Sequence, residues 1–191
     1  MKHINTLKII KIIAAYACIT TACAVFAHIS LETKQAAPGS TYKAVLQVGH
    51  GCNGAATTAI AVQIPPGFQG AKPYPKAGWT VTLQRALLAV PYDNHGKQVT
   101  EDVSHITWTA SNKEAALPDA FFDDFMLRGK LPDTAGPLWF KVLQTCEAGS
   151  NAWVEVPANG TSTQGLKAPA ALLNVQLPDN AAQPKPAEHK H

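Results

Sequence analysis

Alternation of apolar and polar residues is the main pattern in the chain after its first 27 residues. In the stretches TYKAVLQV (41–48) and TTAIAVQI (57–64), every second residue is apolar or a threonine and falls on one face. A period of two is typical of strands with one buried face. The same alternation predicts strands at GWTVTLQ (78–84), HITWT (105–109), FFDDFMLR (121–128), LWFKVLQ (138–144) and AWVEV (152–156).

Turn-forming residues separate these segments, for example in PPGFQGAKPYPKAG (65–78) and PANGTSTQG (157–165). No segment of ten or more residues after the first 27 has a convincing helical period. Short strands joined by Gly- and Pro-rich turns indicate an all-β domain, an antiparallel β-sandwich or barrel. We expect this domain to span 28–177 and to be followed by a disordered tail rich in Pro and His, 178–191.

The first 27 residues predict a secretory signal peptide. Three lysines precede an uncharged, largely apolar run that ends in Val25-Phe26-Ala27, with small residues one and three before the cut. This run has about 16 residues, which is short for a membrane span of roughly 20. Lipoprotein processing at Cys23 is the weaker alternative. Cleavage after Ala27 makes His28 the first residue of the mature protein and predicts a periplasmic location with no retained transmembrane segment.

Removal of the leader changes the charge of the protein. Of its sixteen Lys and Arg, three lie in the leader, so the mature chain balances thirteen basic with thirteen acidic residues. Without a basic surface, a nucleic-acid partner is not expected.

Two cysteines remain in the mature chain, Cys52 and Cys146. In an exported domain they most simply form one disulfide. A metal site built on these cysteines is the alternative.

An N-terminal His28 would offer two nitrogen donors, its α-amine and its ring Nδ1. Together they close a six-membered chelate on one metal ion, and both lose their protons readily near neutral pH. Such donors suit tetragonal Cu(II), which also heads the affinity series of the divalent metals. The alternative is that His28 is simply the residue that cleavage leaves at the N-terminus, with no role in binding a metal.

His50 lies in VGHGCNG, two residues before Cys52. We favour a turn fixed by the disulfide over a ligand role for this histidine. His95 in DNHG is expected in a hairpin turn facing solvent, and His105 on the outer face of a strand.

The stretch FFDDF places two carboxylates among three phenylalanines. Whichever acid points toward apolar surroundings needs a cation or a metal as its partner. The alternative is a strand end at which both Asp123 and Asp124 reach water.

In AWVEV, alternation puts Ala152, Val154 and Val156 on one face and Trp153 on the other. Trp153 is therefore predicted off the core face, where it covers a strand edge or a site. The chain contains no nucleophile elbow, HExxH, phosphate loop or CxxC, so the common motifs of hydrolases and nucleotide-binding enzymes are absent.

The chain resembles the YcnI-like family of exported bacterial copper-binding domains. The resemblance rests on AH followed by ISLET, and on HGCNGAATTAIAVQIPPGF, KAGWTV, ITW, LPDAFFDDFMLRGKLP and LWFKVLQTCEAGSNAWVEVP. It covers about 28–177. It implies an immunoglobulin-like or cupredoxin-like β-sandwich that holds Cu(II) in a single-histidine brace.

Carried onto this chain, the resemblance implies three site residues. His28 is the brace, Asp124 the carboxylate ligand and Trp153 an indole close to the metal rather than a firm ligand. Asp124 stands where glutamate is expected; being one methylene shorter, it binds at closer range or through water.

The resulting hypothesis is a non-enzymatic copper chaperone or buffer of the periplasm that exchanges copper with a periplasmic or membrane protein. A copper-dependent oxidase using the same brace is the first alternative, and it requires a second histidine, for which His50 is the candidate. A metal-free binding module, in which His28 has no role, is the second.

Overall fold

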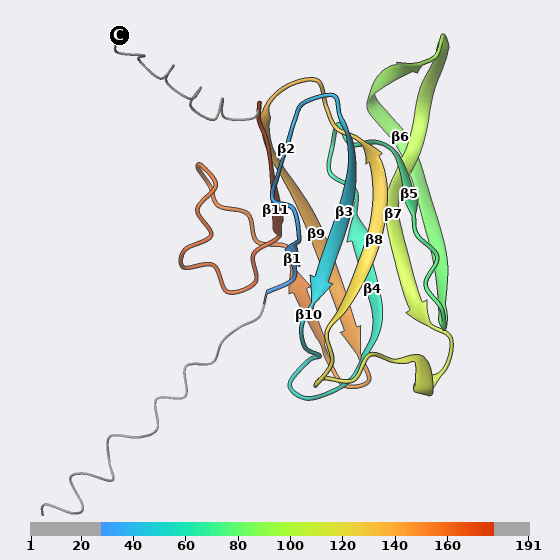
Figure 1. The fold of residues 1–191 in the computed structure, drawn as a ribbon, viewed down its shortest axis with the longest axis vertical. Coiled ribbons are helices and arrows are strands. Elements are labelled where there is room, and N and C mark those ends of the chain that lie inside the picture. Colours follow the sequence, from blue (N-terminus) through green and yellow to red (C-terminus); the bar gives the residue numbers. More distant parts are fainter. Residues whose placement is uncertain (1–27, 178–191) are drawn as a thin grey trace, which may run out of the picture.

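Two facing β-sheets make up the domain in the computed structural model, which describes residues 28–177 (Figure 1). The smaller sheet has the order β1 (Ser30–Leu31), β3 (Thr41–Val48), β8 (Asp123–Lys130), β5 (Gln69–Pro73). The larger sheet has the order β2 (Gln35–Ala36), β11 (Ala171–Val175), β9 (Gly136–Cys146), β4 (Thr57–Gln63), β7 (Lys97–Ala110), β6 (Trp79–Asn94), with β10 (Ser150–Trp153) paired to β9. The predicted all-β sandwich is confirmed.

Pairing is antiparallel except between β2 and β11. The helical content of the described part is one short 3₁₀ turn, Lys113–Ala115. No helix within 28–177 is long and apolar enough to span a membrane. The predicted signal peptide, the lipoprotein alternative at Cys23 and the C-terminal tail lie outside the described residues.

The core lies between the sheets and follows the predicted alternation. Every second residue of β3, from Tyr42 to Val48, is buried, and β4 contributes Ile60 and Val62. Across from them lie aromatic residues of the other strands, including Trp108, Phe125 and Phe140, each fully buried. Burial of so many apolar side chains is the main source of stability in such a domain.

The alternation of β6 continues beyond the core. Trp79 is buried, whereas Leu83 is 49% exposed and Leu87 82% exposed. Leu83 is exposed because β6 is the edge strand of the larger sheet, although its partner Ile106 is buried. Leu87 lies in the part of β6 and β7 that extends past the sandwich as a long hairpin, at the upper right of Figure 1. The hairpin closes at His95 and Gly96, which have φ values of 54° and 80°, as a tight hairpin turn requires. This agrees with the predicted turn at His95.

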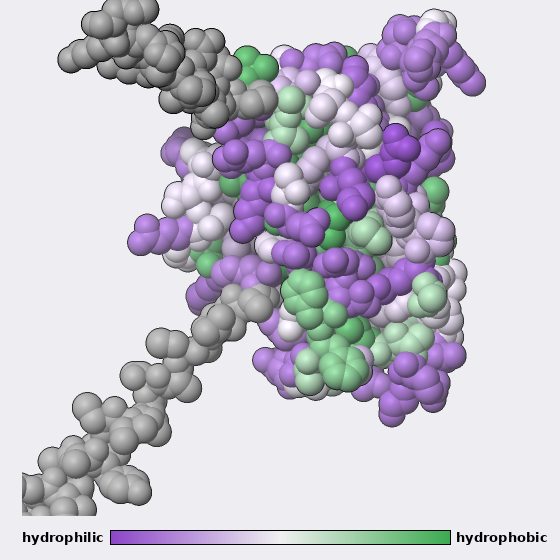
Figure 2. Space-filling view, viewed as in Figure 1, coloured by the Kyte–Doolittle hydropathy of each residue, from purple (hydrophilic) through white to green (hydrophobic). Residues whose placement is uncertain are grey.

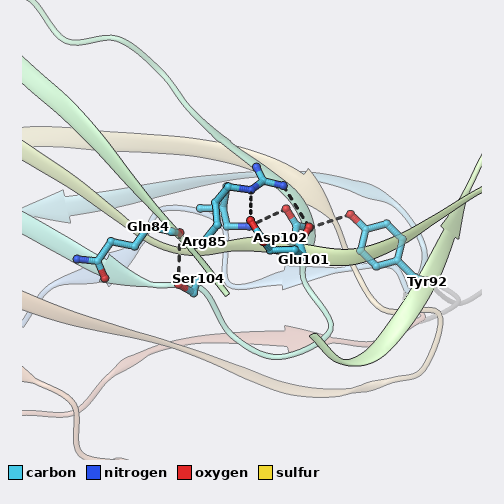
Figure 3. Close-up of polar contacts among 7 residues, drawn as sticks. Gln84, Arg85, Tyr92, Glu101, Asp102 and Ser104 are labelled. Carbon is cyan, nitrogen blue, oxygen red and sulfur yellow. Dashed lines mark hydrogen bonds and ion pairs between the residues drawn. The ribbon is translucent and has the colours of Figure 1, made fainter. Parts of the chain in front are cut away.

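Asp102 of β7 holds the base of this hairpin (Figure 3). Its carboxylate is buried and accepts hydrogen bonds from the Gly70 amide at 2.8 Å, the Tyr92 hydroxyl at 2.8 Å and the Val103 amide at 2.7 Å. Burial, and then the hydrogen bond to Asp102, raise the pKa of Tyr92 to about 12. All the polar atoms of Asp102 therefore have partners that serve the fold.

Candidate metal centre

His28 lies at the entry to the domain, directly before β1. Its neighbour Ile29 is buried and anchors the chain, while His28 itself is exposed. Because Ser30 pairs with Gln47 of β3, His28 lies beside the end of β3, where the chain continues into the segment containing His50. In Figure 1 this is the lower end of the sandwich, to which β10 also belongs.

Trp153 packs against both histidines. Its ring centroid is 5.6 Å from that of His28 and 6.2 Å from that of His50, with interplanar angles of 64° and 73°. Both imidazoles therefore meet the same indole in edge-type contacts, which are favourable for aromatic rings.

The predicted face of Trp153 was wrong. Trp153 is 4% exposed and belongs to the core, whereas Val154 is 41% exposed. The reason is that Trp153 pairs directly with Val142 of β9, an inward-facing residue. Apolar content alone misassigned the faces, because Ala152 and Val154 lie outward at the end of a short strand. The indole still borders the site, but from the core side of the sheet rather than from the solvent-facing side.

Gln144 of β9 fixes the position of the indole. This fully buried side chain accepts a hydrogen bond from Trp153 Nε1 at 3.0 Å and donates to the His50 carbonyl at 2.7 Å and to Thr57 Oγ1 at 2.8 Å. Gln144 was not among the predicted site residues. A signal was present, since Gln144 is in phase with Leu138, Phe140 and Val142 on the core face, and a buried amide there requires polar partners.

The segment from His50 to Cys52 is tightly held. Cys52 and Cys146 form the predicted disulfide, and Asp119 accepts a hydrogen bond from the Gly51 amide at 2.9 Å. A Cβ on Gly51 would come within 1.9 Å of the Ala55 carbonyl oxygen, so this turn accommodates only glycine. His50 thus extends from a rigid turn, in which its Nδ1 lies 2.5 Å from the Gly51 carbonyl oxygen.

The two acids of FFDDF differ in their surroundings. β8 begins only at Asp123, so the two preceding phenylalanines lie outside the strand and are exposed. Asp123 forms an ion pair of 2.6 Å with Lys76, whose ammonium also lies over the Phe125 ring at 4.8 Å. Asp123 therefore has the cation that a carboxylate near apolar side chains requires.

Asp124 has no such direct partner. Its Oδ1 is shielded from solvent and makes no hydrogen bond within the described part of the chain, although the rest of the side chain is half-buried. Desolvation, and then the charges of Glu32 and Asp123, raise the pKa of Asp124, while Lys76 and Lys43 oppose the shift.

The strand register places Asp124 relative to His28. Asp124 pairs with Gln47, which pairs with Ser30, two residues after His28. Asp124 is therefore on the same sheet as the histidine, two strands away. Its free oxygen is of a type that a metal accepts.

Side chains alone do not form a closed metal cage in the described part. No group of three or more His, Cys, Asp and Glu side chains within 28–177 is arranged to hold a metal ion. The rings of His28 and His50 and the free oxygen of Asp124 are the donors described at this end, so a copper site here would also require the α-amine that the predicted cleavage before His28 would create.

The other two histidines of the domain lie in the β6–β7 hairpin. His95 is exposed in its turn, and His105 is half-buried with its Nδ1 3.2 Å from Ser104 Oγ. The predicted full exposure of His105 is thus only partly met, because β6 pairs alongside it.

Two solved structures align with the chain, one of them with a TM-score above 0.5. An uncharacterized protein from Nocardia farcinica with an immunoglobulin-like fold superimposes with a TM-score of 0.60, at 24% identity, over 78% of this chain and 99% of that one. A putative membrane-anchored protein from Corynebacterium diphtheriae aligns with a TM-score of 0.40, at 14% identity, over 83% of this chain and 36% of that one. Among curated proteins, none matches the chain.

The immunoglobulin-like neighbour supports the fold and leaves the chemistry open. The family comparison is more specific. The model of a domain of unknown function, DUF1775, matches residues 28–175, a range that begins at His28 and includes both cysteines, Asp124 and Trp153. The chain therefore belongs to the DUF1775 family, which is the family of YcnI-like domains.

Proposed function

We propose that the protein is an exported copper-binding protein that holds Cu(II) through His28 at its mature N-terminus and acts as a copper chaperone or buffer in the periplasm. One observation carries the proposal. The first residue after the predicted cleavage site is the first residue of the domain, and its ring packs against an indole at one end of the sandwich.

The donor set explains the choice of metal. The α-amine and Nδ1 of His28 give two nitrogens in one chelate, and Asp124 has a carboxylate oxygen with no hydrogen-bond partner among the described residues. Nitrogen and carboxylate ligands in a tetragonal arrangement favour Cu(II) over Zn(II), which prefers a tetrahedral set. In the uncleaved chain the nitrogen of His28 is an amide, so export and copper binding are coupled.

The location of the site suits exchange of copper with a partner. His28 is exposed, and Phe121 and Phe122 directly before β8 are 61% and 62% exposed. Asp123 pairs with Val48, so these phenylalanines lie near the end of β3 that leads to His50. Apolar side chains gather at the lower end of the face shown in Figure 2. An accessible apolar surface beside a metal site suits transient contact with a copper-exchanging partner. Reduction to Cu(I), which prefers sulfur ligands, would promote release.

Two measurements test the proposal. The full chain is exported in a bacterial host and the N-terminal residue of the mature protein is determined by mass spectrometry. We expect His28. The mature protein is then titrated with Cu(II) against a competing chelator, and we expect one tight equivalent. Trp153→Phe and Asp124→Ala are expected to weaken this binding, whereas cleavage elsewhere, or the absence of a tight equivalent, contradicts the proposal.

One contact keeps the oxidase alternative open. His50 packs on the same indole as His28, and oxygen-activating copper braces use a second histidine. Oxygen consumption by the copper-loaded protein in the presence of a reductant distinguishes an oxidase from a chaperone. A mature protein that starts at His28 and yet binds no copper would instead support a metal-free module.

A further inference from the structure

We propose that His50 is a second imidazole ligand, which completes a three-nitrogen donor set with the amine and ring of His28. The inference rests on the proposed function, since it concerns the same metal. It changes the expected site from one histidine to two and leaves Asp124 as an accessory donor.

The tautomer of His50 is set by its own turn. Nδ1 lies 2.5 Å from the Gly51 carbonyl oxygen. A carbonyl oxygen can only accept, so Nδ1 carries the hydrogen and the lone pair of the neutral ring is on Nε2. A hydrogen bond from one ring nitrogen to a main-chain carbonyl is the usual way in which proteins orient a metal-binding histidine.

The position of His50 is set by groups on three sides. Its carbonyl accepts from Gln144, the next amide donates to Asp119, and Cys52 is joined to Cys146. Gln144 also binds the Trp153 indole, so one buried amide links the turn that carries His50 to the ring on which both histidines pack. Preorganised ligands of this kind are expected at metal sites and are unnecessary for a solvent-facing turn.

The relation to His28 completes the argument. Both rings lie within about 6 Å of one indole centroid, at 5.6 and 6.2 Å. His28 is chain-terminal in the mature protein and is followed by the buried Ile29, so its backbone is anchored on one side only. The proposal therefore requires the terminal residue, rather than the held turn of His50, to adjust when the metal binds. The hydrogen bonds of His50 in the described part involve Nδ1 and the carbonyl, which leaves Nε2 for the metal.

Pulsed electron paramagnetic resonance tests the inference, because it detects the remote nitrogen of each coordinated imidazole and counts them. The mature protein is loaded with one equivalent of Cu(II) in a background in which His189→Gln and His191→Gln remove the histidines of the tail. His50→Gln is compared with His95→Gln, a matched change in the turn of the distant hairpin.

We expect two imidazoles in the parent protein and in His95→Gln, and one in His50→Gln. Copper affinity of His50→Gln should be at least about tenfold weaker, because loss of a residue that only orients a metal ligand already costs about 10–100-fold. One imidazole in the parent protein overturns the inference without any variant, and it leaves the His28 brace intact. If His50→Gln folds poorly, His50→Asn and the number of coordinated imidazoles in the parent protein still test the inference. If the parent shows no stoichiometric copper signal, the proposed function and this inference both fail.

Discussion

The two ends of the sandwich each have a buried polar side chain at the centre of a hydrogen-bond network. At the hairpin end, Asp102 uses its carboxylate to hold Gly70, Tyr92 and Val103. At the His28 end, Gln144 holds His50 and Trp153. The two networks differ in the polar atoms near them that remain without a hydrogen-bond partner. Both carboxylate oxygens of Asp102 have partners that serve the fold, whereas near Gln144 two imidazole rings pack on a common indole, and Nε2 of His50 has no hydrogen-bond partner among the described residues. A buried network alone therefore does not indicate a site; remaining donor atoms do.

Removal of the disulfide is expected to have the largest effect on the free energy of unfolding. Cys52 and Cys146 are 94 residues apart, and closing a loop of that length contributes about 4–5 kcal/mol in the chain-entropy model. Cys52→Ser combined with Cys146→Ser should lower the free energy of unfolding by this order, as measured by denaturant titration. Copper affinity should fall as well, because His50 loses its rigid turn. Unchanged copper affinity in the folded variant would show that the turn does not serve the site.

Gln144→Leu should have the next largest effect. It leaves Trp153 Nε1, Thr57 Oγ1 and the His50 carbonyl without their partner, and each buried unsatisfied group costs about 1–3 kcal/mol. We expect a loss of about 3 kcal/mol in the free energy of unfolding, together with weaker copper binding. Denaturant titration and a copper competition assay on the same preparation measure both effects.

Asp102→Asn is the matched change at the other end. It replaces one acceptor oxygen by a donor that faces the Gly70 amide and the Tyr92 hydroxyl, so we expect a loss of about 2 kcal/mol in the free energy of unfolding. Copper affinity should be unchanged, because the hairpin contributes no ligand. A parallel loss of copper binding would break the distinction between the two ends.

Asp124→Asn should have the smallest effect on stability, and with the opposite sign. Since folding raises the pKa of Asp124, the folded state favours the protonated acid; this contribution is complete below the ordinary carboxyl pKa of about 3.9 and is lost as pH rises through the folded pKa. At pH 7 the variant should therefore melt about 1–3 °C higher, with no gain in strong acid. Its copper affinity should decrease, which calorimetry and a competition titration would record together. A variant that loses both stability and copper would show that the carboxylate serves the fold.

Much of the fold could be predicted from the sequence, because alternation identifies buried faces directly. The faces of β3 and of most of β4 were correct for this reason. At the start of β4 the prediction was wrong, because an irregularity between Thr57 and Ala59 buries Thr57 instead of Thr58. The predicted start of β8 and the predicted face of Trp153 were wrong, since neither is fixed by local pattern. A turn that closes at Phe121 makes β8 start later than predicted, at Asp123, and pairing with Val142 turns the indole inward. The disulfide followed from a count of cysteines left after cleavage, which needs no geometry.

Only part of the candidate site could be predicted from the sequence. His28 and Trp153 were named before the fold was known, and the structure brings their rings together. The role of Gln144 and the packing of His50 on the indole depend on contacts between residues far apart in the sequence, 94 positions for His50 and Gln144. A period-two pattern can place each residue on a face, but it cannot say which faces meet at one end of a sandwich.

The most direct test of the central claim is continuous-wave electron paramagnetic resonance of Cu(II) with two proteins. One begins at His28, and the other carries one extra residue before it, which converts the α-amine of His28 into an amide. We predict a tetragonal, nitrogen-ligated signal at one equivalent for the first protein and its loss in the second. Equal signals from both would contradict a copper site built on the N-terminal histidine.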